Sequence, residues 1–157
     1  MPAIFPKMRL GTTSQGLPLF FFLGPDFGGG GWQSKMYERV THHAADRSLG
    51  DFVAAIPCPY EINHPMMTHA SKDVSREFEY RLEWERYYIE RAAMGAERGC
   101  VAIWLPKESS ERPRTDGEPY ARDTRGEIGE LRGWMRYDRG IRFVIGAEPG
   151  FPGLNVI

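Results

Sequence analysis

LPLFFFLG, residues 17–24, carries an unbroken apolar run from Leu19 to Leu23. The run does not alternate with polar residues, so it predicts a strand that is covered on both faces, as in a parallel sheet. Three further stretches have the same character, namely DFVAAIPCP (51–59), CVAIWLP (100–106) and IRFVIGAEP (141–149). The sequence therefore predicts four buried strands.

The segments between these runs read as helices, at about residues 33–49, 74–98 and 124–138. The order β-α-β-α-β-α-β predicts a doubly wound α/β fold of the Rossmann or flavodoxin type. Such a fold has a mostly parallel sheet, here of four to five strands, with helices on both faces. A chain of 157 residues suffices for one continuous core, so we expect a single domain, with residues 1–16 as an extended N-terminal segment.

The charge balance excludes several classes of partner. The net charge is −1, and sixteen Arg with four Lys give no global positive field of the kind that binds nucleic acid polymers. No apolar run is long enough to span a membrane. The N-terminus also lacks the basic and apolar regions of a secretion signal, so we expect a cytoplasmic protein.

No motif for a cofactor or a metal stands out. His64 and His69 have no carboxylate or cysteine at ligand spacing near them. Cys58 and Cys100 each lie in an apolar segment, which is typical of a small buried side chain. The glycine run 28–31 matches neither the dinucleotide nor the phosphate-loop pattern, and we interpret it as a flexible turn or a mobile lid. We therefore expect a site without cofactor or metal.

Glu85 interrupts the apolar face of the second predicted helix. That face is formed by residues at helical spacing, Phe78, Leu82, Ile89, Ala92 and Ala96. Burying an unpaired carboxylate costs several kcal/mol, so Glu85 must bind a cation, take a proton or face a cleft. Arg81 and Arg86 of the same helix are the candidate cations, although neither is expected to share a face with Glu85.

Glu127 allows two interpretations. TRGE at 124–127 matches the Thr-x-x-Glu capping box, in which the Thr124 hydroxyl and the Glu127 carboxylate bind backbone N–H groups at a helix start. Alternatively, a carboxylate beyond the carboxyl end of a strand faces the cleft in which α/β sheets bind ligands, where it can attack an electrophilic carbon. The spacing alone favours the cap.

Five segments, in order, carry a resemblance to a known family. They are FFFLGPDF (20–27), EFEYRLEWERYYIERA (77–92), CVAIWLPKE (100–108), TRGEIGEL (124–131) and IRFVIGAEPGFPGLNV (141–156). They resemble the opening strand with its substrate loop, the Trp-Glu helix, the third strand, the nucleophile motif and the closing strand of nucleoside 2-deoxyribosyltransferases. The resemblance covers most of residues 19–157.

This resemblance implies roles for the two glutamates and the first loop. Glu127 would be the nucleophile that attacks the anomeric carbon of a 2′-deoxynucleoside and forms a covalent deoxyribosyl-enzyme, which a second nucleobase then intercepts. Glu85 would handle the proton on the departing and arriving nucleobase. Gly24, Pro25 and Asp26 match the first substrate loop.

The resemblance also implies a shared site. Asn155 matches an asparagine that binds substrate in the neighbouring subunit, so we expect a homodimer or a larger homo-oligomer. Asp123, four residues before Glu127, is the candidate for binding the sugar hydroxyls. The expected partners are nucleosides and nucleobases, and no cofactor is needed.

Two alternatives stay open at this point. A related branch with the same fold and glutamate hydrolyses the N-glycosidic bond of nucleoside 5′-monophosphates. A non-catalytic nucleotide-binding module is the other alternative, because a fold does not fix a function.

Overall fold

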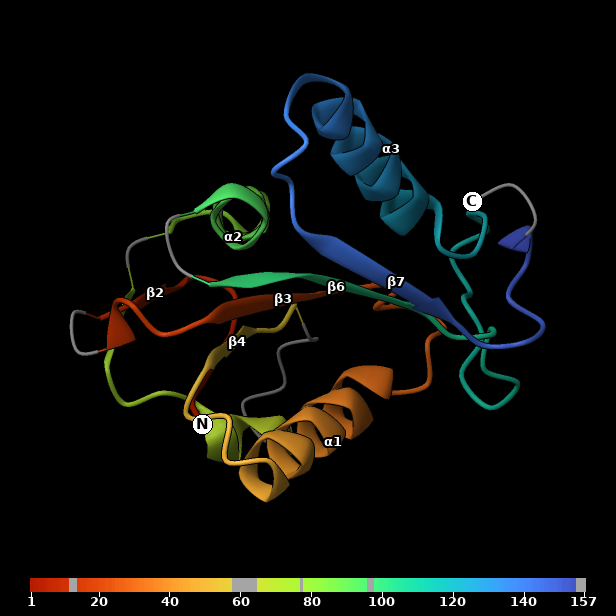
Figure 1. Cartoon of the computed structure of the whole chain (residues 1–157). Helices are drawn as coiled ribbons and strands as arrows, with labels where there is room; N and C mark the ends of the chain where they lie inside the picture. Colours follow the sequence, from red (N-terminus) through yellow and green to blue (C-terminus); the bar gives the residue numbers. More distant parts are fainter. Residues whose placement is uncertain (12–13, 58–64, 77, 96–97, 155–157) are drawn as a thin grey trace.

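The computed structural model describes residues 1–11, 14–57, 65–76, 78–95 and 98–154, and Figure 1 shows their arrangement. Five strands form one sheet in the order β1-β4-β3-β6-β7, and every neighbouring pair in it is parallel. In that order they are β1 (Ala3–Ile4), β4 (Val53–Ala55), β3 (Leu19–Leu23), β6 (Gly99–Leu105) and β7 (Phe143–Ala147). The predicted parallel sheet is confirmed.

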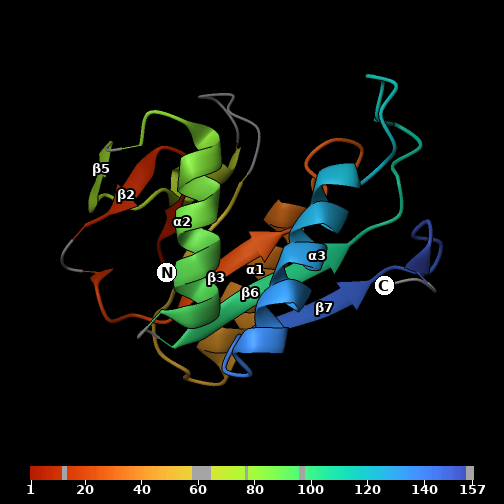
Figure 2. The same ribbon diagram turned by 90° about the horizontal axis from the view of Figure 1, so that it is seen from above.

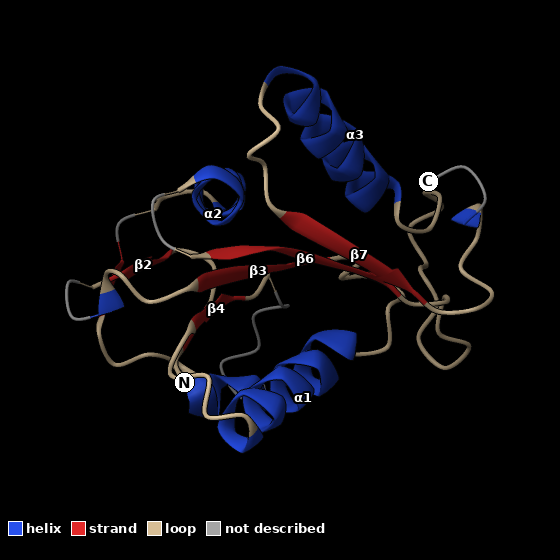
Figure 3. Ribbon diagram, in the orientation of Figure 1, coloured by secondary structure: helices blue, strands red, loops and turns tan. Residues whose placement is uncertain are grey.

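Helices cover both faces of the sheet, as Figure 3 shows. On one face lies α1 (Trp32–Asp46), and on the other lie α2 (Arg81–Met94) and α3 (Arg122–Tyr137). Seen from above, α2 and α3 lie side by side (Figure 2). A short 3-10 helix spans Pro65–His69. Within the described ranges, no helix combines the length and the apolar composition that crossing a bilayer requires.

The central strands supply side chains to two cores. Phe21 and Leu23 of β3 and Ile103 of β6 are buried against α2 and α3. Phe22 and Ala102 are buried on the face that α1 covers. This alternation explains why the strands are apolar at consecutive positions, and it confirms the doubly wound α/β fold.

Three short strands were not expected from the sequence. Within the segment expected to be only extended, β1 joins the main sheet and β2 (Met8–Leu10) pairs antiparallel with β5 (Val74–Arg76). The helix expected at 74–98 therefore begins only at Arg81. Strands of two or three residues carry no readable periodicity, and their pairing joins residues far apart in the chain.

The buried face of α2 also differs from the predicted apolar face. Leu82 is 61% exposed, whereas Trp84, Tyr88 and Ala93 are buried. The Trp84 indole Nε1 donates a hydrogen bond to the Met8 carbonyl at 2.8 Å. At the other end of β2, the N–H of Leu10 donates a hydrogen bond to the Tyr88 hydroxyl. Because Trp84 and Tyr88 occupy the buried face of α2, Leu82 points outwards.

Candidate active site

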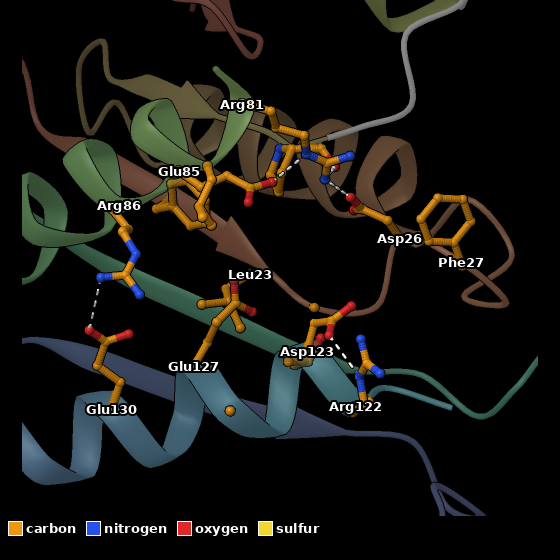
Figure 4. A pocket seen from close by; sticks show the side chains of 16 residues that line it. Leu23, Asp26, Phe27, Arg81, Glu85, Arg86, Arg122, Asp123, Glu127 and Glu130 are labelled. Atoms are coloured by element: carbon orange, nitrogen blue, oxygen red, sulfur yellow. Dashed lines mark hydrogen bonds and ion pairs between the residues drawn. The ribbon is translucent and has the colours of Figure 1, made fainter. Parts of the chain in front are cut away.

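A cavity of about 530 Å³ opens between α2 and α3 at the carboxyl end of β3. This is the edge at which α/β sheets bind ligands, and small-molecule sites have volumes of roughly 300–1,000 Å³. Figure 4 shows the charged side chains that converge on it. They are Asp26, Arg81, Glu85, Arg86, Arg122, Asp123, Glu127 and Glu130.

Most of the residues predicted for the site line this cavity, namely Gly24, Asp26, Glu85, Asp123 and Glu127. Pro25 does not line it, but is buried beside it, where its carbonyl accepts a hydrogen bond from the Trp32 indole at 2.9 Å. Asn155 lies outside the described residues. The fold thus gathers segments that are a hundred residues apart in the chain.

Gly24 lets the chain leave β3 at the required angle. A Cβ atom at this position would lie 2.3 Å from the Trp104 carbonyl oxygen and 2.5 Å from a carbon of the Trp32 ring. No side chain is compatible with such contacts, so only glycine allows this close passage. The tight passage delivers Asp26, two residues later, into the cavity.

Asp26 is held from two sides. Gln33 in the first turn of α1 donates a hydrogen bond to its Oδ1 at 2.9 Å, and Arg81 of α2 forms an ion pair with its Oδ2. The Asp26 side chain is only 9% exposed. Burial raises the pKa of Asp26 to about 6, and the nearby Arg81 offsets only part of this effect.

Arg81 also binds Glu85, one helical turn further along α2. Its Nε lies 2.5 Å from Glu85 Oε1, and the Glu85 side chain is 15% exposed. The expectation that neither arginine shares a face with Glu85 is therefore wrong for Arg81, because residues four apart on a helix are neighbours. Arg86 instead points to Glu130 of α3, at 3.9 Å.

The start of α3 overturns the capping interpretation of Glu127. The helix begins at Arg122, and its N-cap is Ala121, which adopts a left-handed conformation and makes no side-chain cap hydrogen bond. Thr124 is thus a buried residue of the first turn rather than the cap. Glu127 lies in the second turn, where no free backbone N–H needs its carboxylate.

Glu127 instead projects from α3 into the cavity, towards the α2 wall that carries Glu85 (Figure 4). In the part of the chain that the structure describes, no hydrogen bond or ion pair reaches its carboxyl group. Burial raises the pKa of Glu127 to about 8, and the charges of Glu85, Asp26 and Asp123 add to this increase. In the free protein this carboxyl group is therefore mostly protonated at neutral pH.

Asp123 lies at the rim of the cavity and is 69% exposed. It pairs with its neighbour Arg122 at 3.1 Å, and Arg122 also binds Glu118 at 2.6 Å. A carboxylate in this position can accept hydrogen bonds from hydroxyl groups of a ligand at the mouth. Arg122 and Asp123 thus form a polar edge above the buried carboxylates.

Among the described residues, no group of three or more His, Cys, Asp or Glu side chains has the arrangement of a metal site. Comparison of the chain with models of protein families, with curated proteins and with solved structures gives no match in any of the three. The chemistry of the site must therefore be argued from its own side chains.

Two site residues were missed at the level of sequence. Arg81 was considered only as a partner for Glu85, and its i,i+4 spacing was the available signal for a place in the site. Gln33 gave no signal, because its contact with Asp26 depends on how α1 follows the glycine run. The contact emerges only from the folded geometry.

Proposed function

We propose that this protein transfers 2-deoxyribose between nucleobases through a covalent deoxyribosyl-Glu127 intermediate. One observation carries the proposal. Glu127 is a half-buried carboxyl group without a described partner, and it shares a cavity with Glu85, a second carboxyl group fixed by Arg81. A nucleophile beside an acid–base group is what displacement at an anomeric carbon requires. The family resemblance of the TRGEIGEL and Trp-Glu segments supports the same roles.

The first half-reaction balances with a single proton. A Glu127 oxygen forms a bond to C1′ of the deoxynucleoside while the bond from C1′ to the base nitrogen breaks. The departing base needs a proton, and the neutral Glu127 carboxyl group holds one before substrate binds. Glu85, an anion paired with Arg81, takes this proton and passes it to the base. The products are the glutamyl ester of deoxyribose and the free base.

The second half-reaction runs the same steps in reverse with another nucleobase. The incoming base nitrogen attacks C1′, the ester bond breaks, and the proton of the base returns through Glu85 to the Glu127 carboxylate. No proton is exchanged with water over the full cycle. A carboxyl group whose pKa lies near the working pH suits both halves, because it both loses and regains the proton readily.

The charges of the cavity favour an uncharged nucleoside over its 5′-monophosphate. Five carboxyl groups and three arginines line the cavity, so it carries no excess of positive charge. Each arginine already faces a carboxylate: Arg81 binds Asp26 and Glu85, Arg86 faces Glu130, and Arg122 binds Glu118 and Asp123. A phosphate would have to displace these carboxylates and would meet their repulsion. Transfer between nucleosides is therefore preferred to hydrolysis of nucleotides.

The test is chromatography of protein incubated with deoxyinosine or thymidine and free adenine or cytosine. The expected result is a new deoxynucleoside that Glu127→Gln does not form. Glu90→Gln is the matched control, because it removes an exposed carboxylate of α2 that does not line the cavity. Release of free base without a new nucleoside would favour the hydrolase, and no turnover of nucleosides or monophosphates would favour a binding module.

The resemblance also leads us to propose that Asn155 of a partner subunit completes the site. Mixing Glu127→Gln protein with Asn155→Ala protein tests this proposal. Hybrid dimers would contain one site with both residues intact, so the mixture should recover part of the activity that each variant lacks. A mixture no more active than its components would contradict a shared site.

A further inference from the structure

We propose that Arg81 is the positioning residue of this site: its guanidinium bridges Asp26 and Glu85, which come from separate elements, and fixes both carboxylates for their roles beside Glu127. This inference rests on the proposed function, since it explains how the acid–base group is held beside the nucleophile. Arg81 lies in the Trp-Glu segment of the resemblance, which implies no role for it, and its role follows from its contacts.

The contacts of Arg81 join three segments of the chain. Its Nε binds Glu85 Oε1 at 2.5 Å within α2, and its Nη2 binds Asp26 Oδ2 in the loop after β3. Nη2 also lies 3.4 Å from the carbonyl oxygen of Pro57, which follows β4. Figure 4 shows Arg81 between its two carboxylates. Different nitrogens of one planar group therefore fix two carboxylates from separate elements.

The orientation of the Asp26 side chain does not depend on Arg81 alone. Gln33 already donates a hydrogen bond to Asp26 Oδ1, so the orientation of that side chain has a second support. What Gln33 cannot supply is a positive charge. Asp26 is 9% exposed and Glu85 15% exposed, so each would favour its neutral form if no cation were near. The Arg81 side chain is about one third exposed and can keep its own charge.

The other charged groups at the cavity do not replace Arg81. They are Arg86 of α2 and Arg122, Asp123, Glu127 and Glu130 of α3. The two other arginines face carboxylates of α3 or of the preceding loop. The charges of Glu85, Asp26 and Asp123 all raise the pKa of Glu127. Arg81 lowers this pKa, but by less than any of the three carboxylates raises it. The carboxylates that Arg81 binds thus favour the neutral form of Glu127.

The two ion pairs of Arg81 matter for the reaction. If a neutral side chain replaced Arg81, Asp26 and Glu85 would lose the cation that stabilises their charged forms. A protonated Glu85 cannot accept the proton of Glu127 and pass it to the departing base, so the attack on C1′ would lose its proton transfer. The change Arg81→Gln should thus impair chemistry more than substrate binding.

The test is a ¹³C NMR titration of the full chain labelled at the carboxyl carbons of Asp and Glu. Signals are assigned with Asp26→Asn, Glu85→Gln and Glu127→Gln. In the wild type, Asp26 should titrate near pH 6 and Glu127 near pH 8. In Arg81→Gln, the midpoint of Asp26 should rise by about one unit or more, because the cation that offsets part of its burial is gone. Arg47→Gln, an exposed change at the end of α1, is the matched control.

An unchanged midpoint of Asp26 in a folded Arg81→Gln protein would overturn the proposal. If that variant does not fold, Arg81→Lys serves, because its single ammonium group keeps the charge but cannot bind both carboxylates as the guanidinium does. The midpoint of Asp26 should then rise as well, and an unchanged midpoint would again overturn the role of Arg81.

The kinetic readout is separate. If the wild type transfers deoxyribose, Arg81→Gln should lower kcat by about 100-fold or more with little change in KM. A wild type without turnover would contradict the proposed function, while the NMR midpoints would still decide the role of Arg81. Failure of the function and failure of this inference therefore give different results.

Discussion

Two cavities lie at the carboxyl edge of the sheet, one on each face, and they differ in the state of their charges. The one between α2 and α3 has a volume of about 530 Å³, and two of its carboxylates, those of Asp26 and Glu85, are only 9% and 15% exposed. The one beside α1 is larger, at about 630 Å³, but its cations Lys35, Arg39 and Lys107 are exposed. Volume therefore does not identify the site, whereas burial of charge does.

The difference lies in what burial does to acid–base chemistry. The charge of an exposed lysine or arginine is solvated by water. The buried carboxyl groups are altered, with the pKa of Glu127 raised to about 8 and that of Asp26 to about 6. Such altered groups, gathered in one cleft, are typical of catalytic sites.

The largest expected effect is the loss of turnover in Glu127→Gln. The amide has nearly the same size but cannot form the ester with C1′, so kcat should fall by at least about 1,000-fold. Steady-state rates of base exchange measure this effect, with Glu90→Gln as the control. A variant with rates close to those of the wild type would remove the chemical distinction between the two cavities.

The next effect concerns the stability of the wild type as a function of pH. The pKa of Glu127 is raised from an ordinary value of 4.5 to about 8, so between these values the folded state holds a proton that the unfolded state has lost. The free energy of unfolding should therefore fall as pH rises through this window, by about 1 kcal/mol per pH unit from this group. Urea titrations at pH 5.5 to 8.5 measure the slope.

Comparison with Glu127→Gln sharpens this prediction, because the amide does not titrate. The variant should lose most of the decline above pH 6, where Asp26 has already titrated. Parallel stability curves for the wild type and the variant would contradict the assignment of the raised pKa to Glu127. Double variants with Lys35→Ala and Lys107→Ala should leave the slope unchanged.

A smaller effect is expected at Gly24, which lines the cavity between α2 and α3. In Gly24→Ala the new Cβ would collide with the Trp104 carbonyl and the Trp32 ring, so the free energy of unfolding should fall by about 1–3 kcal/mol. Gly129→Ala in α3 is the matched control, because nothing lies within 4 Å of its Cβ position. That change should stabilise the helix by up to about 1 kcal/mol. Equal effects of the two substitutions would contradict the tight turn after β3.

The smallest effect is predicted for the cavity beside α1. Lys35→Ala and Lys107→Ala remove exposed charges that line the cavity on the other face of the sheet. Rates of base exchange should change by less than about twofold, since surface charges contribute little. A large loss of activity in either variant would show that both cavities take part in the reaction.

The parts of the fold that sequence predicts are those with long local signals. The runs at 17–24 and 100–106 are continuously apolar because both faces are buried, and they form β3 and β6. Strands β1, β2 and β5 escape such an analysis, because two or three residues form no pattern and their partners are distant in the chain.

The contacts within the site could be predicted from the sequence even less well than the short strands. Glu85 and Glu127 were recognisable as carboxylates in unusual positions, but the capping motif at Thr124 was misleading, since α3 starts two residues earlier at Arg122. The bridge from Arg81 to Asp26 spans 55 positions of the chain and depends on how α2 is docked. Local spacing cannot reveal such a contact.

The most direct test of the central claim is intact-protein mass spectrometry after incubation with a deoxynucleoside and no acceptor base. The wild type should gain the mass of one deoxyribosyl group, peptide mapping should place it on Glu127, and added adenine should remove it. Turnover without an adduct on Glu127, or an adduct that persists in Glu127→Gln, would contradict a nucleophilic role for this glutamate.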